Sequence, residues 1–156
     1  MLRERVYCYE LYHQLRVYLD RVCKDGEQAF PYTLHGEIDK RGHNYVFKQL
    51  RMRPNPDFVI HEPGTIDRNL AVIEVKSTDN KRALFFEDID KLYAFVTKLD
   101  YRVGILYVFG PQDELAFNPD ALILYATKGR TFPFIILWHQ AVDTKPIMVF
   151  PNKKNE

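Results

Sequence analysis

The sequence predicts an α/β fold in which a mixed central sheet has helices on both faces. Three observations lead to this prediction. A long helical pattern opens the chain, two strands joined by a short turn follow it, and residues 70–109 then form a strand, a helix and another strand. A short turn joins antiparallel strands, whereas a strand–helix–strand unit joins parallel ones. The 156 residues, 46% hydrophobic and 28% charged, fit a single domain spanning residues 1–156.

The first helix is predicted over residues 2–24, where apolar side chains recur at spacings of three and four. This stripe consists of Cys8, Leu11, Leu15, Tyr18 and Val22. Residues 30–39 predict a short strand and its exit, and residues 57–61 a second strand. After the turn signal Glu62-Pro63-Gly64, residues 70–76 begin as a continuous apolar run, which is typical of a strand buried on both faces.

The second half of the chain continues the alternation. A helix is predicted over about residues 83–99, with Asp88, Lys91 and Lys98 turned away from its apolar stripe. The stripe consists of Phe85, Ile89, Leu92, Val96 and Leu99. Residues 102–109 predict a strand, and residues 121–127 and 132–139 a further pair of strands. The sequence therefore predicts a strand-rich C-terminal extension.

Charged side chains converge where the two strands of the predicted hairpin meet. Asp57 begins the first strand, and Glu74 and Lys76 lie near the end of the second. Strand periodicity puts Glu74 and Lys76 on one side of the sheet and turns Val75 into the core. Mg²⁺ prefers oxygen ligands, which Asp57, Glu74 and the backbone carbonyl of Val75 can supply. With Lys76 to stabilise charge, this patch suits metal-assisted hydrolysis of a phosphodiester.

The same residues resemble the signature of the PD-(D/E)XK nuclease superfamily, which has a restriction-endonuclease-like fold. Pro56 and Asp57 match its first half, and Glu74 and Lys76 its second. The order of predicted elements over residues 2–109 is similar to the αβββαβ core of that fold. The resemblance implies a nuclease that uses Mg²⁺ or Mn²⁺ to cleave DNA, as an endonuclease or exonuclease. It also implies a third acidic metal ligand on the first helix.

Two points of this assignment stay open. Glu10 is the preferred third acid because of its place in the helix, and Glu37 is its rival. A second match to the motif consists of Pro119-Asp120 with Asp143 and Lys145. We reject this second match because the eleven residues after Lys145 cannot form the helix and strand that must follow.

A basic stretch is the predicted contact surface for the DNA backbone. Residues 40–53 hold several basic residues and no acid, interleaved with His43, Tyr45 and Phe47. Basic and aromatic side chains together suit phosphate contact and base stacking, although a solvated hairpin is the alternative. The predicted contacts are Lys40, Arg41, Lys48, Arg51, Arg53, Lys81 and Arg82.

The remaining features set the context. The net charge is only +1, so bulk charge does not drive DNA binding. The first residues contain no apolar signal segment, and no apolar run is long enough for a membrane, so a cytoplasmic protein is expected. The sequence does not decide whether the protein forms a homodimer, which would suit cleavage of two DNA strands. The alternative function is a non-catalytic module on the same fold that binds nucleic acid or protein, or a subunit of a complex.

Overall fold

The sheet has six strands that lie side by side in chain order. The computed structural model describes residues 4–25, 31–36, 55–65 and 67–151. The strands are β1 (Thr33–Gly36), β2 (Phe58–His61), β3 (Asn69–Ser77), β4 (Val103–Phe109), β5 (Phe134–His139) and β6 (Ile147–Phe150). β3, β4 and β5 are parallel, and the other neighbours are antiparallel. The predicted mixed sheet, with its hairpin and its parallel crossover, is confirmed.

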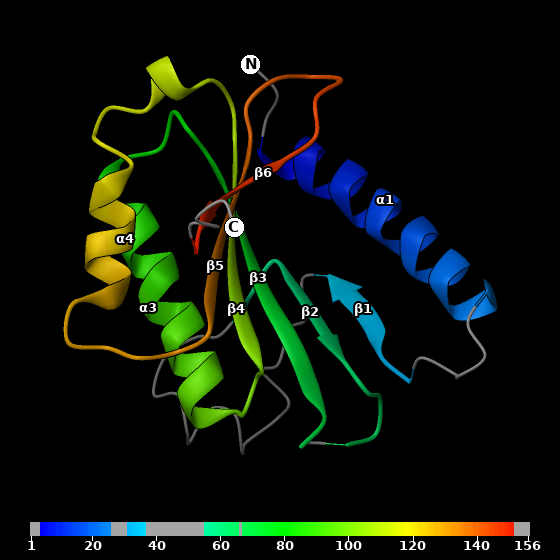
Figure 1. Cartoon of the computed structure of the whole chain (residues 1–156). Coiled ribbons are helices and arrows are strands. Elements are labelled where there is room, and N and C mark those ends of the chain that lie inside the picture. The colour runs from blue at the N-terminus through cyan, green and yellow to red at the C-terminus, as the bar shows by residue number, and fades with distance from the viewer. Residues whose placement is uncertain (1–3, 26–30, 37–54, 66, 152–156) are drawn as a thin grey trace, which may run out of the picture.

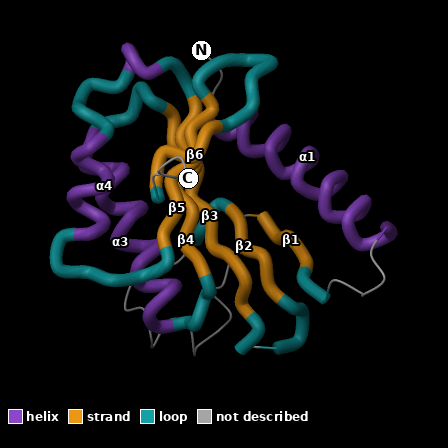
Figure 2. The backbone as a smooth tube through the Cα atoms, viewed as in Figure 1, coloured by secondary structure: helices purple, strands orange, loops and turns teal. Residues whose placement is uncertain are grey.

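Helices cover both faces of this sheet. α1 (Glu4–Asp25) lies on one face, and α3 (Arg82–Lys98) and α4 (Asp120–Thr127) lie on the other. Figure 2 shows the strands as one layer between these helices. None of the helices in the described residues is long and apolar enough to cross a membrane.

Each face has its own apolar core. On the α1 face, Leu11 and Leu15 pack against a cluster that includes Leu34 and Val75. On the other face, the α3 residues Phe85, Ile89 and Leu92 are fully buried. Consecutive residues of β4 alternate between the two cores, as expected for a strand with helices on both sides. The helix predicted over residues 83–99 is therefore confirmed with its apolar stripe facing the sheet.

Two sequence-based expectations need correction. Residues 121–127 form α4 instead of a strand, because the chain must cross over to bring β5 parallel to β4. The side chain of Asn118 accepts a hydrogen bond from the Asp120 N–H at 2.9 Å, which supports the start of this helix. The predicted stripe of the first helix is also buried only in part. Tyr18 is 64% exposed and Val22 42%, because this end of α1 extends beyond β1 (Figure 1).

Candidate active site

The hairpin of β2 and β3 brings the first acid against the end of the central strand. Phe58 pairs with Ile73 in the antiparallel register, so Asp57 lies opposite Glu74. The backbone N–H of Val75 donates a hydrogen bond of 2.7 Å to Oδ2 of Asp57. This bond fixes the Asp57 carboxylate beside the strand that carries Glu74 and Lys76.

Successive residues of β3 point to opposite faces of the sheet. Val75 is fully buried in the core below α1. Glu74 and Lys76 point the other way, toward α3. Glu74 is only 2% exposed, which is unusual for a carboxyl group and requires a partner.

Two residues of α3 supply those partners. Nζ of Lys91 lies 2.9 Å from Oε1 of Glu74 and 3.3 Å from Oδ1 of Asp88. Nζ of Lys76 lies 2.9 Å from Oδ2 of Asp88. The helical pattern predicts that Asp88 and Lys91 face away from the core, and this prediction is wrong. Asp88 stands three residues after Phe85 and four before Leu92, so it lies within the buried face of the helix.

The acid that α1 contributes is Glu4. Its Oε1 lies 3.8 Å from Nζ of Lys76, and its Oε2 accepts hydrogen bonds from the Ser77 N–H and the Asn80 amide. Glu10 is exposed, and its Oε1 accepts a hydrogen bond from Gln14. Six residues separate the two acids, which is about one and two-thirds turns, so they face in different directions. The structure therefore does not bring Glu10 to the site, and Glu37 lies outside the described residues.

Acidic and basic groups form one network, which we call the β3–α3 cluster. It consists of Glu4, Asp57, Glu74, Lys76, Asp88 and Lys91. Burial raises the pKa of Glu74 well above its usual range, although Lys91 opposes this shift. Burial also raises the pKa of Asp57, against the hydrogen bond from Val75. Ionisation of either carboxyl group at neutral pH therefore costs free energy unless a cation lies close to it.

Burial acts in the opposite sense on the two lysines, but their acidic neighbours outweigh it. Burial lowers the pKa of Lys76, but the nearby acids Asp88, Glu4 and Glu74 together more than offset burial, so the net shift is upward. Burial acts in the same way on Lys91, and Glu74, Asp88 and Asp57 together more than offset it, which raises the pKa of Lys91. Both ammonium groups thus stay charged at neutral pH and neutralise part of the carboxylate charge.

The donors of the cluster suit a hard divalent cation. Mg²⁺ is commonly held by one or two carboxylates, with waters and substrate phosphate in the other positions. Asp57 and Glu74 are such a pair, with the backbone carbonyl of Val75 as the predicted third oxygen. Over the described part of the chain, no three side chains of His, Cys, Asp or Glu are arranged to hold a metal by themselves. Lys91 contacts an oxygen that Glu74 would offer to a metal, so the two cations would compete.

The remaining predicted residues lie apart from this cluster or outside the described chain. Lys81 and Arg82 are exposed at the start of α3, and Cζ of Arg82 lies 5.7 Å from the ring of Phe86. The other predicted DNA contacts, Lys40, Arg41, Lys48, Arg51 and Arg53, are not among the described residues.

The rejected second motif is not built on strands. Asp120 opens α4, and Asp143 lies in the turn between β5 and β6 with a positive φ of 63°. Its residues therefore lack the strand hairpin that positions Asp57 and Glu74.

Comparisons of this chain with protein-family models, with curated proteins and with solved structures found no match.

Proposed function

We propose that the protein is a metal-dependent nuclease that hydrolyses phosphodiester bonds of DNA, with Mg²⁺ or Mn²⁺ as its cofactor. The observation that carries the proposal is the 2.7 Å hydrogen bond from the Val75 N–H to Asp57, which holds the Asp57 carboxylate beside the strand that carries Glu74. Lys76 follows on the same face of β3. The order of α1, β1, β2, β3, α3 and β4 also agrees with the αβββαβ order that the resemblance to the restriction-endonuclease-like fold implies.

The residues have distinct roles in this proposal. Asp57 and Glu74 would hold the metal, and Glu4 would replace Glu10 as the acid from the first helix. A bound metal would polarise the phosphate and lower the pKa of a coordinated water. Lys76, oriented by Asp88 at 2.9 Å, places a positive charge where negative charge develops on the phosphate. Lys91 would have to release Glu74 for that carboxylate to hold a metal.

A second candidate is a non-catalytic module that binds nucleic acid or a protein. The contact of 2.9 Å between Lys91 and Glu74 favours it, because an ammonium group already compensates the most buried acid. In this case the cluster would stabilise the fold, and a metal would add nothing.

Cleavage of labelled single- and double-stranded DNA with Mg²⁺ or Mn²⁺ separates the two candidates. We expect metal-dependent cutting by the native chain and its loss in Lys76→Met, with folding checked by circular dichroism. Lys98→Met is the matched control, because Lys98 is exposed in the last turn of α3. Cutting that survives in Lys76→Met, or no cutting by the native chain on any substrate, would contradict the nuclease proposal.

A further inference from the structure

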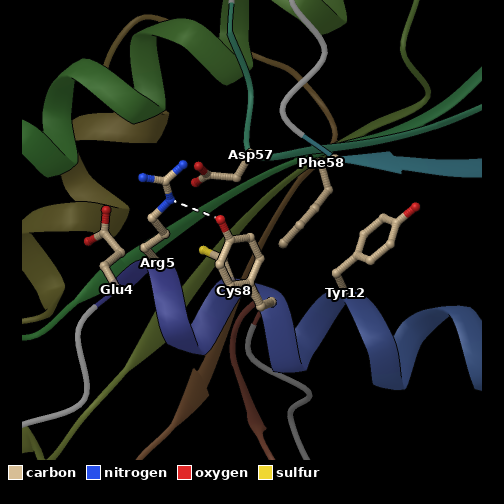
Figure 3. A pocket seen from close by; sticks show the side chains of 8 residues that line it. Glu4, Arg5, Cys8, Tyr12, Asp57 and Phe58 are labelled. Carbon is tan, nitrogen blue, oxygen red and sulfur yellow. Dashed lines mark hydrogen bonds between the residues drawn. The ribbon is translucent and has the colours of Figure 1, made fainter.

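A pocket of about 520 Å³ opens beside the β3–α3 cluster, between the first turns of α1 and the edge formed by β1 and β2. Figure 3 shows the side chains around it. Among the described residues, its lining consists of Glu4, Arg5, Cys8, Tyr9, Tyr12, Gly36, Asp57 and Phe58. Glu4 and Asp57 belong both to this lining and to the cluster. A group bound in the pocket would therefore touch the residues that we assign to the metal.

The walls of the pocket favour a flat, uncharged ring. Tyr9, Tyr12 and Phe58 supply three aromatic rings, and the rings of Tyr12 and Phe58 lie 6.0 Å apart at a tilt of 30°. Aromatic side chains of this kind stack on nucleobases without regard to sequence, because every base presents a π face. The volume is also within the range of pockets that bind small ligands.

The charges of the pocket fit a nucleotide better than a free anion. Among the described lining residues, Arg5 is the only cation, and its Nε donates a hydrogen bond of 3.0 Å to the Tyr9 hydroxyl. Glu4 and Asp57 would repel an isolated phosphate. A neutral base that lies against the rings avoids this repulsion, and its backbone phosphate can point toward the positive charge of Arg5.

Gly36 keeps the floor of the pocket open. A Cβ atom at this position would lie 3.4 Å from Cδ2 of Tyr12 and 3.5 Å from Cδ1 of Phe58, which is ordinary van der Waals contact. The backbone therefore accommodates a Cβ atom, and the further atoms of a larger side chain would extend toward these rings.

We propose that this pocket binds one unpaired nucleobase of a single-stranded DNA next to Asp57. The inference rests on the proposed function and deepens it by naming the substrate class. A base inside a duplex is stacked on both faces, so it must leave the stack before it can enter such a pocket. The substrate is accordingly single-stranded DNA, or DNA with an unpaired nucleotide at the cleavage position.

Binding without cleavage tests the pocket. Fluorescence anisotropy in EDTA compares a labelled thymidine oligonucleotide with a duplex of the same length. We expect the single strand to bind at least tenfold more tightly, and Tyr9→Leu to weaken this binding by about tenfold. Gly36→Val should weaken it in the same direction. Tyr18→Leu is the matched control on the same helix, because Tyr18 is 64% exposed and Tyr9 58%.

Equal affinity for duplex and single strand, or unchanged affinity in both Tyr9→Leu and Gly36→Val, would contradict the proposal that this pocket binds an unpaired nucleobase. These outcomes do not depend on catalysis. If the native chain cuts duplex DNA at rates that Tyr9→Leu leaves unchanged, the nuclease proposal stands and the pocket fails. If single-strand binding depends on Tyr9 but no metal supports cutting, the pocket stands and the nuclease proposal fails.

Discussion

Replacing Lys91 by Met is the sharpest perturbation of the β3–α3 cluster. Met keeps most of the length of the side chain and removes the ammonium group that contacts Glu74 and Asp88. These two side chains are 3% and 8% exposed, so water cannot replace the lost partner. Removing one partner of a buried pair costs about 3–5 kcal/mol. Because domains are stable by only about 5–15 kcal/mol, urea denaturation will resolve such a loss.

The loss of stability in Lys91→Met is expected to increase with pH. Burial already raises the pKa of Glu74 in the folded state, so the folded state binds its proton more tightly than the unfolded state. Stability is then full below the unfolded pKa and falls as pH rises toward the folded pKa. Lys91 lowers the pKa of Glu74, so its removal raises that pKa further. We expect a small destabilisation at pH 5 and the full one at pH 8.

Lys98→Met is the control for Lys91→Met, because Lys98 lies on the same helix and is exposed. A divalent cation provides a second measurement. Mn²⁺ should raise the melting temperature of Lys91→Met more than that of the native chain, since the metal no longer competes with an ammonium group. A broken buried pair costs about 3–5 kcal/mol. If the free energy of unfolding of Lys91→Met at pH 8 stays within about 1 kcal/mol of the native value, Lys91 is not a required partner of the buried carboxylates.

Three further predictions concern stability measured by urea denaturation. Glu74→Gln should flatten the fall in stability between pH 5 and 8, because Gln does not ionise, and should stay folded, because Lys91 keeps Asp88 as its partner; a profile parallel to the native one would contradict this. Leu92→Ala should cost about 2–5 kcal/mol, since Leu92 is fully buried, and a cost below about 1 kcal/mol would mean that the core relaxes around it. Gly110→Ala should cost at least about 1–3 kcal/mol, because φ is +112° and the added Cβ would overlap Oγ1 of Thr78; an unchanged midpoint would show that this loop shifts freely.

The sequence predicted most of the fold because its elements carry strong periodic signals. The length and pattern of the buried apolar run in β3 fit only a strand. Those of the apolar stripe in α3 fit only a helix. α4 has only eight residues, and its short apolar run has no clear period, so the sequence pattern favours a strand there. The start signal Asn118-Pro119-Asp120 and the spacing of four between the buried Leu122 and Ala126 indicate the helix.

The candidate site was predicted in part. The meeting of Asp57, Glu74 and Lys76 followed from strand pairing, which local patterns determine. Asp88 and Lys91 were missed because charged residues in an amphipathic helix normally face water. Their inward orientation depends on partners in β3, which are distant in the sequence.

The choice of acid from the first helix depends on where that helix meets the sheet. Helical spacing alone does not fix this position, so the sequence favoured Glu10 over Glu37 and did not indicate Glu4. Tertiary contacts with Lys76, Ser77 and Asn80 decide for Glu4.

The measurement that tests the nuclease proposal most directly compares the native chain with Glu74→Gln for DNA cleavage and stability in the same preparation. The comparison is informative because this variant is expected to remain folded at pH 8 while it loses a metal-binding carboxylate. We predict Mn²⁺-dependent cutting of single-stranded DNA by the native chain and none by the stable variant. Equal cutting by both, or no metal-dependent cutting by the native chain, would contradict the assignment of this cluster as the active site of a nuclease.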